Sequence, residues 1–302
     1  LSLHDALPIW GKKLSGTIAV GGLKNAATPI IAATLLSSEP SILENVPRIE
    51  DVFRMLEIVE SLGATVEWLH EHSVKITPRE IDPRHMDQEK VKHLRSSILL
   101  LGALSARFDS FELRQPGGCV IGARPVEAHL DALMKLGVKV EQKEKGYVID
   151  ATGRRGGKVV LCQMSVTATE NAMMLAALLP GETKIKIAAC EPHVTDLGYF
   201  LEKMGVAITG LGTHTLVIQG QTELHGATHA IMPDHNEAAT YLILGAATGS
   251  EITVVHARED DLDLVLEKLR SFGVTFTVDT DQITIHPAKH LHAPTLFIDP
   301  RP

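Results

Sequence analysis

Two kinds of hydrophobic pattern alternate along the chain. One is apolar on nearly every side of a helix, and it occurs at residues 25–36, 96–106, 169–179 and 236–247. The other is amphipathic, with apolar residues at helical spacing such as Val52, Met55, Leu56 and Val59. A helix that is apolar all round must be buried, whereas an amphipathic helix covers a core with one face. The pattern therefore predicts buried helices inside an outer layer.

The two helix patterns recur in four copies of one repeat. Each amphipathic helix ends at a glycine, and these glycines are 74, 68 and 68 residues apart: Gly63, Gly137, Gly205 and Gly273. Glycine at this place is typical of a helix C-terminus. Short strands and hairpins fill the rest of each copy, as at residues 251–255, 274–278 and 282–285. The predicted fold class is α/β, built from repeated βαβαββ units.

One repeat cannot bury its own apolar helix, so we expect about three repeats to close around a shared core. This predicts one domain at residues 22–231 that carries the first three repeats. Residues 11–21 and 232–302 are expected to belong to a second, incomplete domain. The alternative is an open solenoid of four repeats.

Composition narrows the functional classes. The 302 residues carry a formal charge of −8, so we expect no bulk attraction to nucleic acid or to an anionic membrane. No apolar run approaches the roughly 18 residues of a membrane span. The three cysteines lie far apart, which predicts neither a disulfide framework nor a zinc site and favours the cytoplasm. The histidines lack carboxylates in metal-binding register and no phosphate-binding glycine loop follows a strand, so we expect no metal and no cofactor.

The second repeat contains a glycine-rich insertion, Pro116-Gly117-Gly118-Cys119-Val120-Ile121-Gly122-Ala123-Arg124-Pro125. Glycines allow a backbone to approach a ligand closely, and they make Cys119 an exposed thiol that can donate a proton or, as thiolate, attack an electrophile. Cys162 and Cys190 are instead interpreted as small core residues, because Cys162 follows the apolar run 159–161.

Three cations are candidates for an anion site. Arg124 precedes a helix, where its guanidinium and the free N–H groups of the helix end could bind a phosphate or a carboxylate. Lys24 stands at the start of the first apolar helix, a position at which a cation opposes the helix dipole unless an anion binds there. Asn25 suits the N-cap of that helix. Arg95 holds the equivalent position in the second repeat.

Three motifs carry a resemblance to a known family. They are Gly22-Leu23-Lys24-Asn25-Ala26-Ala27, the insertion at residues 116–126, and Ser165-Val166-Thr167-Ala168-Thr169. Together, over residues 14–302, they resemble the UDP-N-acetylglucosamine enolpyruvyl transferases. The resemblance implies two inside-out α/β barrel domains of three repeats each, of which four of six repeats are present. It also implies transfer of the enolpyruvyl group of phosphoenolpyruvate to the sugar 3′-hydroxyl, the first committed step of peptidoglycan biosynthesis.

The resemblance also implies roles for residues. Cys119 would be the acid that protonates the enolpyruvyl methylene and the thiol that fosfomycin alkylates. Lys24 and Arg124 would hold phosphoenolpyruvate, with Asn25 beside them. The implied contacts of the nucleotide sugar are Arg95, Arg124, Pro125, Val126, Glu127, Ala128, Gln163, Met164, Ser165 and Val166.

The sequence departs from the family pattern at several points. Gln163 stands where members often have Lys, Thr167 where they often have Gly, and Glu127 where Asp is commoner. Residues 1–10 do not resemble the family's start and are expected to be an artefact. The chain stops before the family segment that carries the base for the sugar hydroxyl, so the expectation is a C-terminally truncated enzyme that is inactive alone.

Two other functions remain open on the sequence. One is the sister family that forms enolpyruvylshikimate phosphate, whose members lack the Gly-Gly-Cys insertion. The other is a relative that binds the substrates without catalysis. The oligomeric state does not follow from the sequence.

Overall fold

The structure is a computed structural model that describes residues 13–117, 126–288 and 291. The chain divides into two compact units. The larger unit is continuous, Gly22–Met232, and the smaller unit combines Leu1–Gly21 with Pro233–Pro302. Within the described residues, no helix is both long and apolar enough to cross a membrane.

Buried helices form the interior of the larger unit. They are α2 (Lys24–Thr34), α7 (Val166–Ala177), and α5 (Leu100–Arg107), which continues from the 3-10 helix η3 (Arg95–Leu99). Every residue of α5 from Leu100 to Ala106 is buried, as the all-round apolar pattern predicts. The helices α5 and α7 pack so closely that a Cβ on Gly102 would lie 2.4 Å from the backbone oxygen of Asn171.

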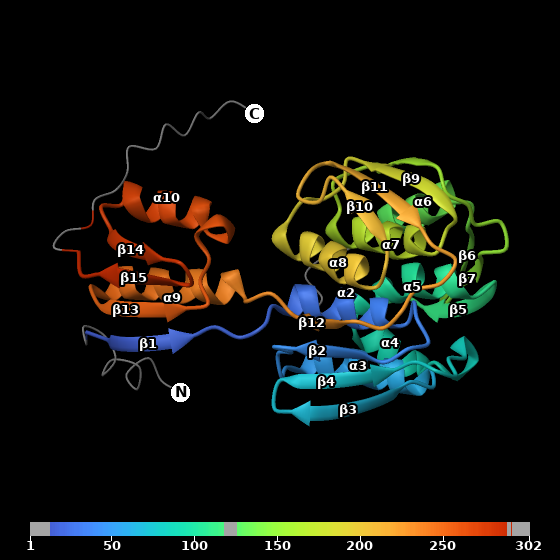
Figure 1. Ribbon diagram of the computed structural model, residues 1–302, viewed down its shortest axis with the longest axis horizontal. Helices are drawn as coiled ribbons and strands as arrows, with labels where there is room; N and C mark the ends of the chain where they lie inside the picture. The colour runs from blue at the N-terminus through green and yellow to red at the C-terminus, as the bar shows by residue number, and fades with distance from the viewer. Residues whose placement is uncertain (1–12, 118–125, 289–290, 292–302) are drawn as a thin grey trace. The chain divides into compact units, whose positions relative to one another are not determined.

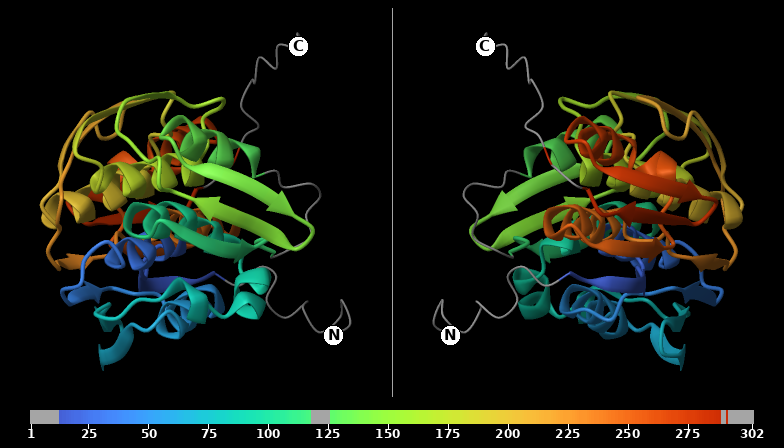
Figure 2. Two further views of the ribbon diagram at one scale, coloured as in Figure 1. Left: turned by 90° about the vertical axis from the view of Figure 1, so that its right-hand side faces the viewer. Right: turned by 90° about the vertical axis from the view of Figure 1, so that its left-hand side faces the viewer.

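Three sheets surround these helices (Figure 1). The first contains β2 (Ser41–Glu44), β3 (Thr65–His70), β4 (Ser73–Thr77) and β12 (Thr228–Ala230). The second contains β5 (Ser110–Arg114), β6 (Lys139–Lys143) and β7 (Gly146–Asp150), and its β6–β7 hairpin, light green in Figure 2, lies on the outer surface of the unit. The third contains β8 (Lys158–Val160), β9 (Gly181–Lys186), β10 (Ala207–Thr209) and β11 (Thr215–Gly220).

Amphipathic helices complete the repeats of the larger unit. They are α3 (Glu50–Ser61), α6 (Glu127–Lys135) and α8 (Pro192–Lys203). The glycine after each amphipathic helix has a positive φ, and the next residue donates its N–H to a carbonyl five residues back, as Ala64 does to Val59. This is the Schellman helix end, so the predicted glycine caps are confirmed, including Gly273 in the fourth repeat.

The order of strands differs from the expected repeat in two ways. The strand β1 (Ser15–Ala19) precedes α2 in the chain but pairs in parallel with β13 (Glu251–Val255) of the fourth repeat. The strand β12 precedes the fourth repeat but pairs in parallel with β2 of the first. The first and fourth repeats have therefore exchanged their leading strands, which the spacing of the pattern could not reveal.

The second repeat has no leading strand in its sheet. The 3-10 helix η2 (Pro83–His85) and the helix α4 (Gln88–His93) replace it. The amide of Gln88 donates to the carbonyl of Glu112 (3.1 Å) and accepts the N–H of Arg114 (2.8 Å). These groups lie on the open edge of β5, so one side chain satisfies them in place of a strand.

The smaller unit contains the fourth repeat. Its elements are α9 (His235–Thr248), β13, η4 (Glu259–Asp261), α10 (Asp263–Ser271), β14 (Thr275–Asp279) and β15 (Gln282–His286). Only Ala238, Leu242, Gly245 and Ala246 of α9 are buried, whereas Ile243 is 51% exposed. The single repeat thus covers only one face of α9, as expected from the prediction that one repeat cannot bury its own apolar helix.

Candidate functional site

The N-terminal ends of the three buried helices form the candidate site. The C-terminal ends of α2, α5 and α7 meet around a cavity of about 450 Å³, where Arg107 donates to the carbonyl of Leu35 at 2.6 Å. The three helices therefore run in the same direction, and their N-terminal ends lie at the opposite end of the unit. The free N–H groups and the dipole of a helix N-terminus attract anions.

Lys24 lies in the first turn of α2, as the sequence predicts, but it has a partner. Its ammonium nitrogen lies 2.9 Å from a carboxylate oxygen of Asp51, in the first turn of α3. Sequence reasoning missed Asp51. Its signal is weak, because an acidic residue at the start of a helix is common for reasons of helix stability alone.

Asn25 does not cap this helix, so that prediction is wrong. The N-cap is Leu23, whose N–H donates to the carbonyl of Met232 at 2.9 Å. This bond holds Leu23 in an extended conformation, and the N-cap lies two residues earlier than predicted. Asn25 is left as an exposed side chain in the first turn, beside Lys24.

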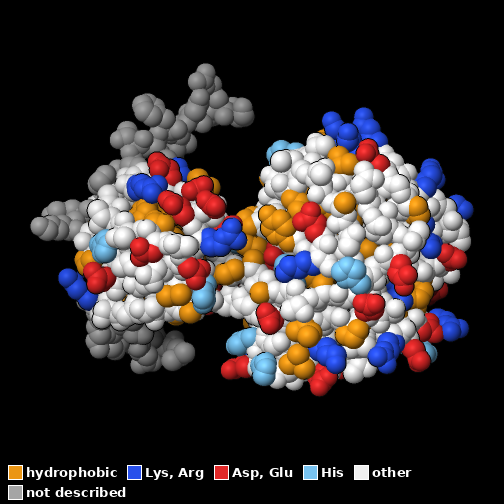
Figure 3. Space-filling view, in the orientation of Figure 1, with side chains coloured by type: hydrophobic (Ala, Val, Ile, Leu, Met, Phe, Trp, Pro, Cys, Tyr) orange, Lys and Arg blue, Asp and Glu red, His pale blue; other side chains and the backbone are white. Residues whose placement is uncertain are grey.

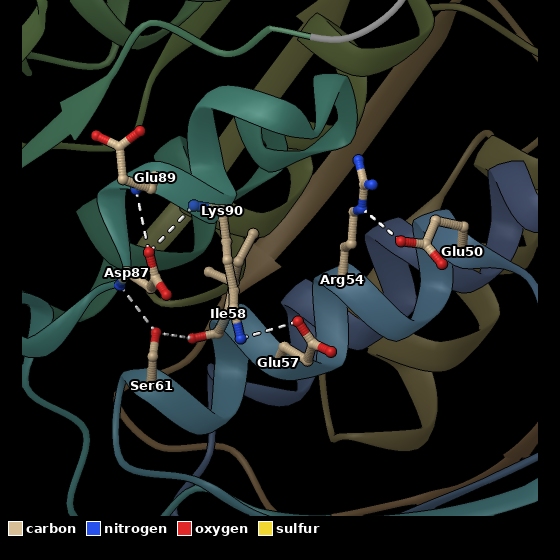
Figure 4. Close-up of polar contacts among 8 residues, drawn as sticks. All are labelled: Glu50, Arg54, Glu57, Ile58, Ser61, Asp87, Glu89 and Lys90. Atoms are coloured by element: carbon tan, nitrogen blue, oxygen red, sulfur yellow. Dashed lines mark hydrogen bonds and ion pairs between the residues drawn. The ribbon is translucent and has the colours of Figure 1, made fainter.

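A network of polar contacts between α3 and α4 supports Arg95 (Figure 4). Asp87 accepts the N–H groups of Glu89 and Lys90 at 3.1 Å and so caps α4. Its own N–H donates to the Ser61 hydroxyl at 3.0 Å, and Lys90 forms an ion pair of 2.8 Å with Glu57. Two residues after α4 ends, Arg95 begins η3, so this network fixes the helix that leads into it.

Three predicted site residues, Cys119, Arg124 and Pro125, lie outside the described residues. The described chain does show how the insertion begins. In the other repeats a residue with positive φ follows the strand after the buried helix: Asn45, Ile187 and His256. After each of the three, the next N–H donates to the carbonyl of a hairpin turn, as Val46 does to His72 at 2.9 Å. In the second repeat that next residue is Pro116, which has no N–H to donate.

Gly117 passes directly over the end of α4. A Cβ at this position would lie 1.8 Å from the carbonyl oxygen of Lys92. Only glycine permits this approach. The segment that leads to Cys119 therefore rests on the same helix that leads to Arg95.

The chain after the insertion enters α6 through Val126, the N-cap residue. Val126 and Ala128 are buried, whereas Glu127 is exposed. Of the predicted contacts in this segment, Glu127 is therefore the one whose side chain is accessible to a ligand.

The segment before α7 supplies the remaining predicted contacts. Ser165 caps α7, with its hydroxyl 3.4 Å from the N–H of Ala168. Gln163 and Met164 are exposed, and Ser165 and Val166 are half-buried. Exposed side chains beside a helix N-terminus are accessible to an anionic ligand.

Cys162 and Cys190 are not core residues, so this interpretation was wrong. Cys162 is exposed and Cys190 is half-buried. The strand β8, of which only Val159 is buried, ends at Val160, and the chain bends at residues 162–163 before α7 begins.

A buried histidine, His129, connects the two predicted sugar-binding segments. Its Nε2 lies 2.6 Å from the hydroxyl of Thr167 and its Nδ1 lies 3.1 Å from the carbonyl of Val126. Burial lowers the pKa of His129, and the charge of Arg95 lowers it further. Sequence reasoning missed His129, although a histidine on the buried face of an amphipathic helix, in line with Ala132 and Leu133, was a usable signal.

Charged residues of both signs are mixed over the visible face of the structure, with no field of one sign (Figure 3). An anion site must therefore be formed by a local cluster of Lys and Arg side chains, as the negative net charge of the sequence predicts.

Comparison with known proteins assigns the chain to a family. A family profile described as EPSP synthase (3-phosphoshikimate 1-carboxyvinyltransferase) matches residues 10–297. A UDP-N-acetylglucosamine 1-carboxyvinyltransferase of Campylobacter hominis is 41% identical over 281 residues, which cover 92% of this chain and 67% of that protein. The protein of the same name from Coxiella burnetii is 40% identical over 278 residues, which cover 92% of this chain and 64% of that protein. The chain thus spans about two thirds of the length of these relatives.

Solved structures show the same fold. The enolpyruvyl transferase NikO from Streptomyces tendae superposes with a TM-score of 0.81 at 24% identity, over 93% of this chain and 67% of that one. An EPSP synthase from Acinetobacter baumannii gives a TM-score of 0.72 at 20% identity, over 93% and 66% of the two chains. The predicted fold class is confirmed as that of the enolpyruvyl transferases. By its relatives at 40–41% identity, the chain belongs to the UDP-N-acetylglucosamine 1-carboxyvinyltransferase family, as its three motifs predict.

Proposed function

We propose that this protein transfers the enolpyruvyl group of phosphoenolpyruvate to the 3′-hydroxyl of UDP-N-acetylglucosamine and acts in the cytoplasm, at the start of peptidoglycan biosynthesis. The observation that carries the proposal is the shared direction of the three buried helices, since Lys24, Arg95 and Ser165 stand at their N-terminal ends. Both substrates are anions, and this end combines cations with helix N-termini. The names of the relatives support UDP-N-acetylglucosamine as the acceptor and the carboxyvinyl (enolpyruvyl) group as the group transferred.

The reaction needs an addition followed by an elimination. The sugar hydroxyl loses its proton to a general base as its oxygen forms a bond to C2 of phosphoenolpyruvate, and the methylene carbon C3 takes a proton from an acid. The resulting tetrahedral intermediate then loses a proton from C3 and inorganic phosphate from C2. We propose that Cys119 supplies the first proton and that Lys24 and Arg124 hold the phosphate and carboxylate. A positioned acid commonly contributes about 100- to 10,000-fold to such a step.

We assign the nucleotide sugar to the two segments that α6 and α7 bring together. Glu127, Gln163 and Met164 present accessible side chains there, and Arg95 lies beside His129 on the same side. Residues 22–231 would thus be the domain of the catalytic insertion, and residues 11–21 with 232–302 would belong to a second domain.

The test is selective modification of Cys119 combined with ligand binding. We expect fosfomycin to modify Cys119 much faster than Cys162 or Cys190, measured by mass spectrometry of peptides. The exposed Cys162 is a stringent comparison because its thiol is also accessible. UDP-N-acetylglucosamine should bind in calorimetry, whereas shikimate 3-phosphate should not. Equal labelling of the three thiols, or binding of shikimate 3-phosphate alone, would contradict the proposal. Binding without phosphate release in the full-length protein would identify a non-catalytic relative.

A further inference from the structure

A continuous chain of hydrogen bonds runs from the start of α6 to α5 through His129. The carbonyl of Val126 can only accept, so Nδ1 of His129 carries the proton of that bond. With the ring neutral, Nε2 carries no proton and accepts from the hydroxyl of Thr167 at 2.6 Å. The less common Nδ1-protonated tautomer of the imidazole is therefore the one present.

The chain continues through the first turns of α7. The backbone carbonyl of Thr167 accepts the side-chain amide of Asn171 at 2.8 Å. The amide oxygen of Asn171 accepts the N–H of Gly102 at 2.6 Å. Gly102 is the third residue of α5, directly after the turn of η3. In this chain of hydrogen bonds each donor has one acceptor, so the positions of the amide oxygen and nitrogen of Asn171 are unambiguous.

This chain of hydrogen bonds lies between the two segments that are predicted to contact the nucleotide sugar. Val126 directly follows residues 118–125, and Thr167 directly follows the predicted contacts at residues 163–166. The histidine is 5% exposed and Asn171 is fully buried, whereas Thr167 between them is half-buried. A largely buried hydrogen-bond network favours one arrangement of its members.

We propose that His129 is a positioning residue of the nucleotide-sugar site. It holds the exit of the insertion and the start of α7 at a fixed separation, so that the two segments contact one ligand together. The inference rests on the proposed function. It also explains Thr167, which stands where family members often have glycine: glycine has no hydroxyl for Nε2 of His129.

The matched variants are Thr167→Val, which removes the hydroxyl and keeps the shape, and Thr167→Ser, which restores the hydroxyl. The control is Thr34→Val, since Thr34 is a buried hydroxyl at the far end of α2 that only bonds within its own helix. We expect Thr167→Val to weaken binding of UDP-N-acetylglucosamine by about 3- to 10-fold, the worth of one lost hydrogen bond. Thr167→Ser should bind nearly as the wild type does. Binding of inorganic phosphate should be unchanged in all three.

Two measurements on the full 302-residue chain test the positioning role of His129. Calorimetry gives both dissociation constants, and ¹⁵N NMR of labelled histidine reports the tautomer, with the Nδ1-protonated form of His129 expected in the wild type and in Thr167→Ser. Equal sugar-nucleotide affinity of wild type and Thr167→Val would overturn the proposal. The proposal would also be overturned if Thr167→Val weakened the binding of both ligands equally and lowered the melting temperature. That result would indicate a purely structural role for the hydroxyl. If the wild type binds no UDP-N-acetylglucosamine, the proposed function fails and the positioning role fails with it, even where NMR finds the hydrogen bond.

Discussion

The ammonium of Lys24 and the carboxylate of Asp51 lie 2.9 Å apart across the first turns of α2 and α3. Both side chains are roughly half-exposed, so this ion pair contributes little to folding, about 0–1 kcal/mol for pairs of this kind. The ion pair matters for ligand binding, because an anion that approaches Lys24 must compete with Asp51.

Replacing Asp51 should therefore strengthen anion binding. We expect Asp51→Asn to raise the affinity for phosphoenolpyruvate or inorganic phosphate by about 2- to 5-fold, which corresponds to the worth of an exposed ion pair. Calorimetry at low salt measures the change, and Glu67→Gln, which breaks the exposed Lys75–Glu67 pair on β3 and β4, is the control. A weaker affinity in Asp51→Asn would mean that Asp51 orients Lys24 rather than competing for it.

The contact between Gly117 and Lys92 predicts a distant effect on Cys119. In Gly117→Ala the added carbon would overlap the backbone oxygen of Lys92, so the start of the insertion must shift. We expect the rate of Cys119 modification by fosfomycin to fall at least several-fold, since small misplacements of reacting groups are costly. At Gly21 an added Cβ meets nothing within 4 Å, so Gly21→Ala should label at the normal rate. An unchanged rate in Gly117→Ala would show that the base of the insertion does not position the thiol.

Ile187 is a site of backbone strain that a substitution can relieve. Its φ is +59°, a conformation that a β-branched residue adopts at a cost, whereas the equivalent residue of the first repeat is Asn45. We expect Ile187→Asn to stabilise the larger unit by about 1 kcal/mol and to raise its melting temperature by about 2–4 °C. Val160→Asn replaces a similarly exposed aliphatic residue within a strand, and calorimetry should find no gain there. Destabilisation by Ile187→Asn would show that the side chain's contacts outweigh the strain.

Glu170 gives a prediction about pH. The side chain is buried in α7 and its Oε1 has no hydrogen-bond partner. Burial raises the pKa of Glu170 well above its ordinary value, and the nearby charge of Glu191 adds to this effect. The carboxyl thus stays protonated in the folded protein while it ionises in the unfolded one. Stability from this group is present below about pH 4.5 and is lost as pH rises toward the folded pKa.

Glu170→Gln should therefore be more stable than the wild type at pH 7 and similar to it near pH 4.5. The gain should increase with pH by up to about 1.4 kcal/mol per unit. Urea denaturation at the two pH values measures it, with the exposed Glu202→Gln as control. A gain that is the same at both pH values would mean that ionisation of Glu170 is not its cause.

Much of the fold follows from local patterns. The buried helices, the amphipathic helices and the four glycine caps depend on neighbouring residues, and all can be predicted from spacing and polarity. The error at Asn25 has a non-local cause. The bond between Leu23 and Met232 joins residues 209 positions apart and determines where α2 starts.

The candidate site was predictable where its residues belong to motifs, as Lys24 and Ser165 do, or hold equivalent places in the repeats, as Arg95 does. The residues that support these positions were not, because their role depends on which repeats pack together. His129 and Thr167 are 38 residues apart, and although Thr167 belongs to a motif, nothing in the sequence shows that its hydroxyl contacts His129. Likewise, the edge of β5 is completed by Gln88, which nothing in its local sequence distinguishes from a surface residue.

The exchange of leading strands has a consequence for protein synthesis. The strand β1 is made early, yet its partner β13 lies 236 residues further along the chain, as the pair Ser15 and Glu251 shows. At about 5–20 residues per second, β1 waits roughly 10–50 s on the ribosome before that partner emerges. Four of its five residues are exposed even in the folded protein, and its sequence Ser-Gly-Thr-Ile-Ala contains a single large apolar side chain. A strand of this kind has little tendency to aggregate while it waits, because a nascent edge is most hazardous when it is long and hydrophobic.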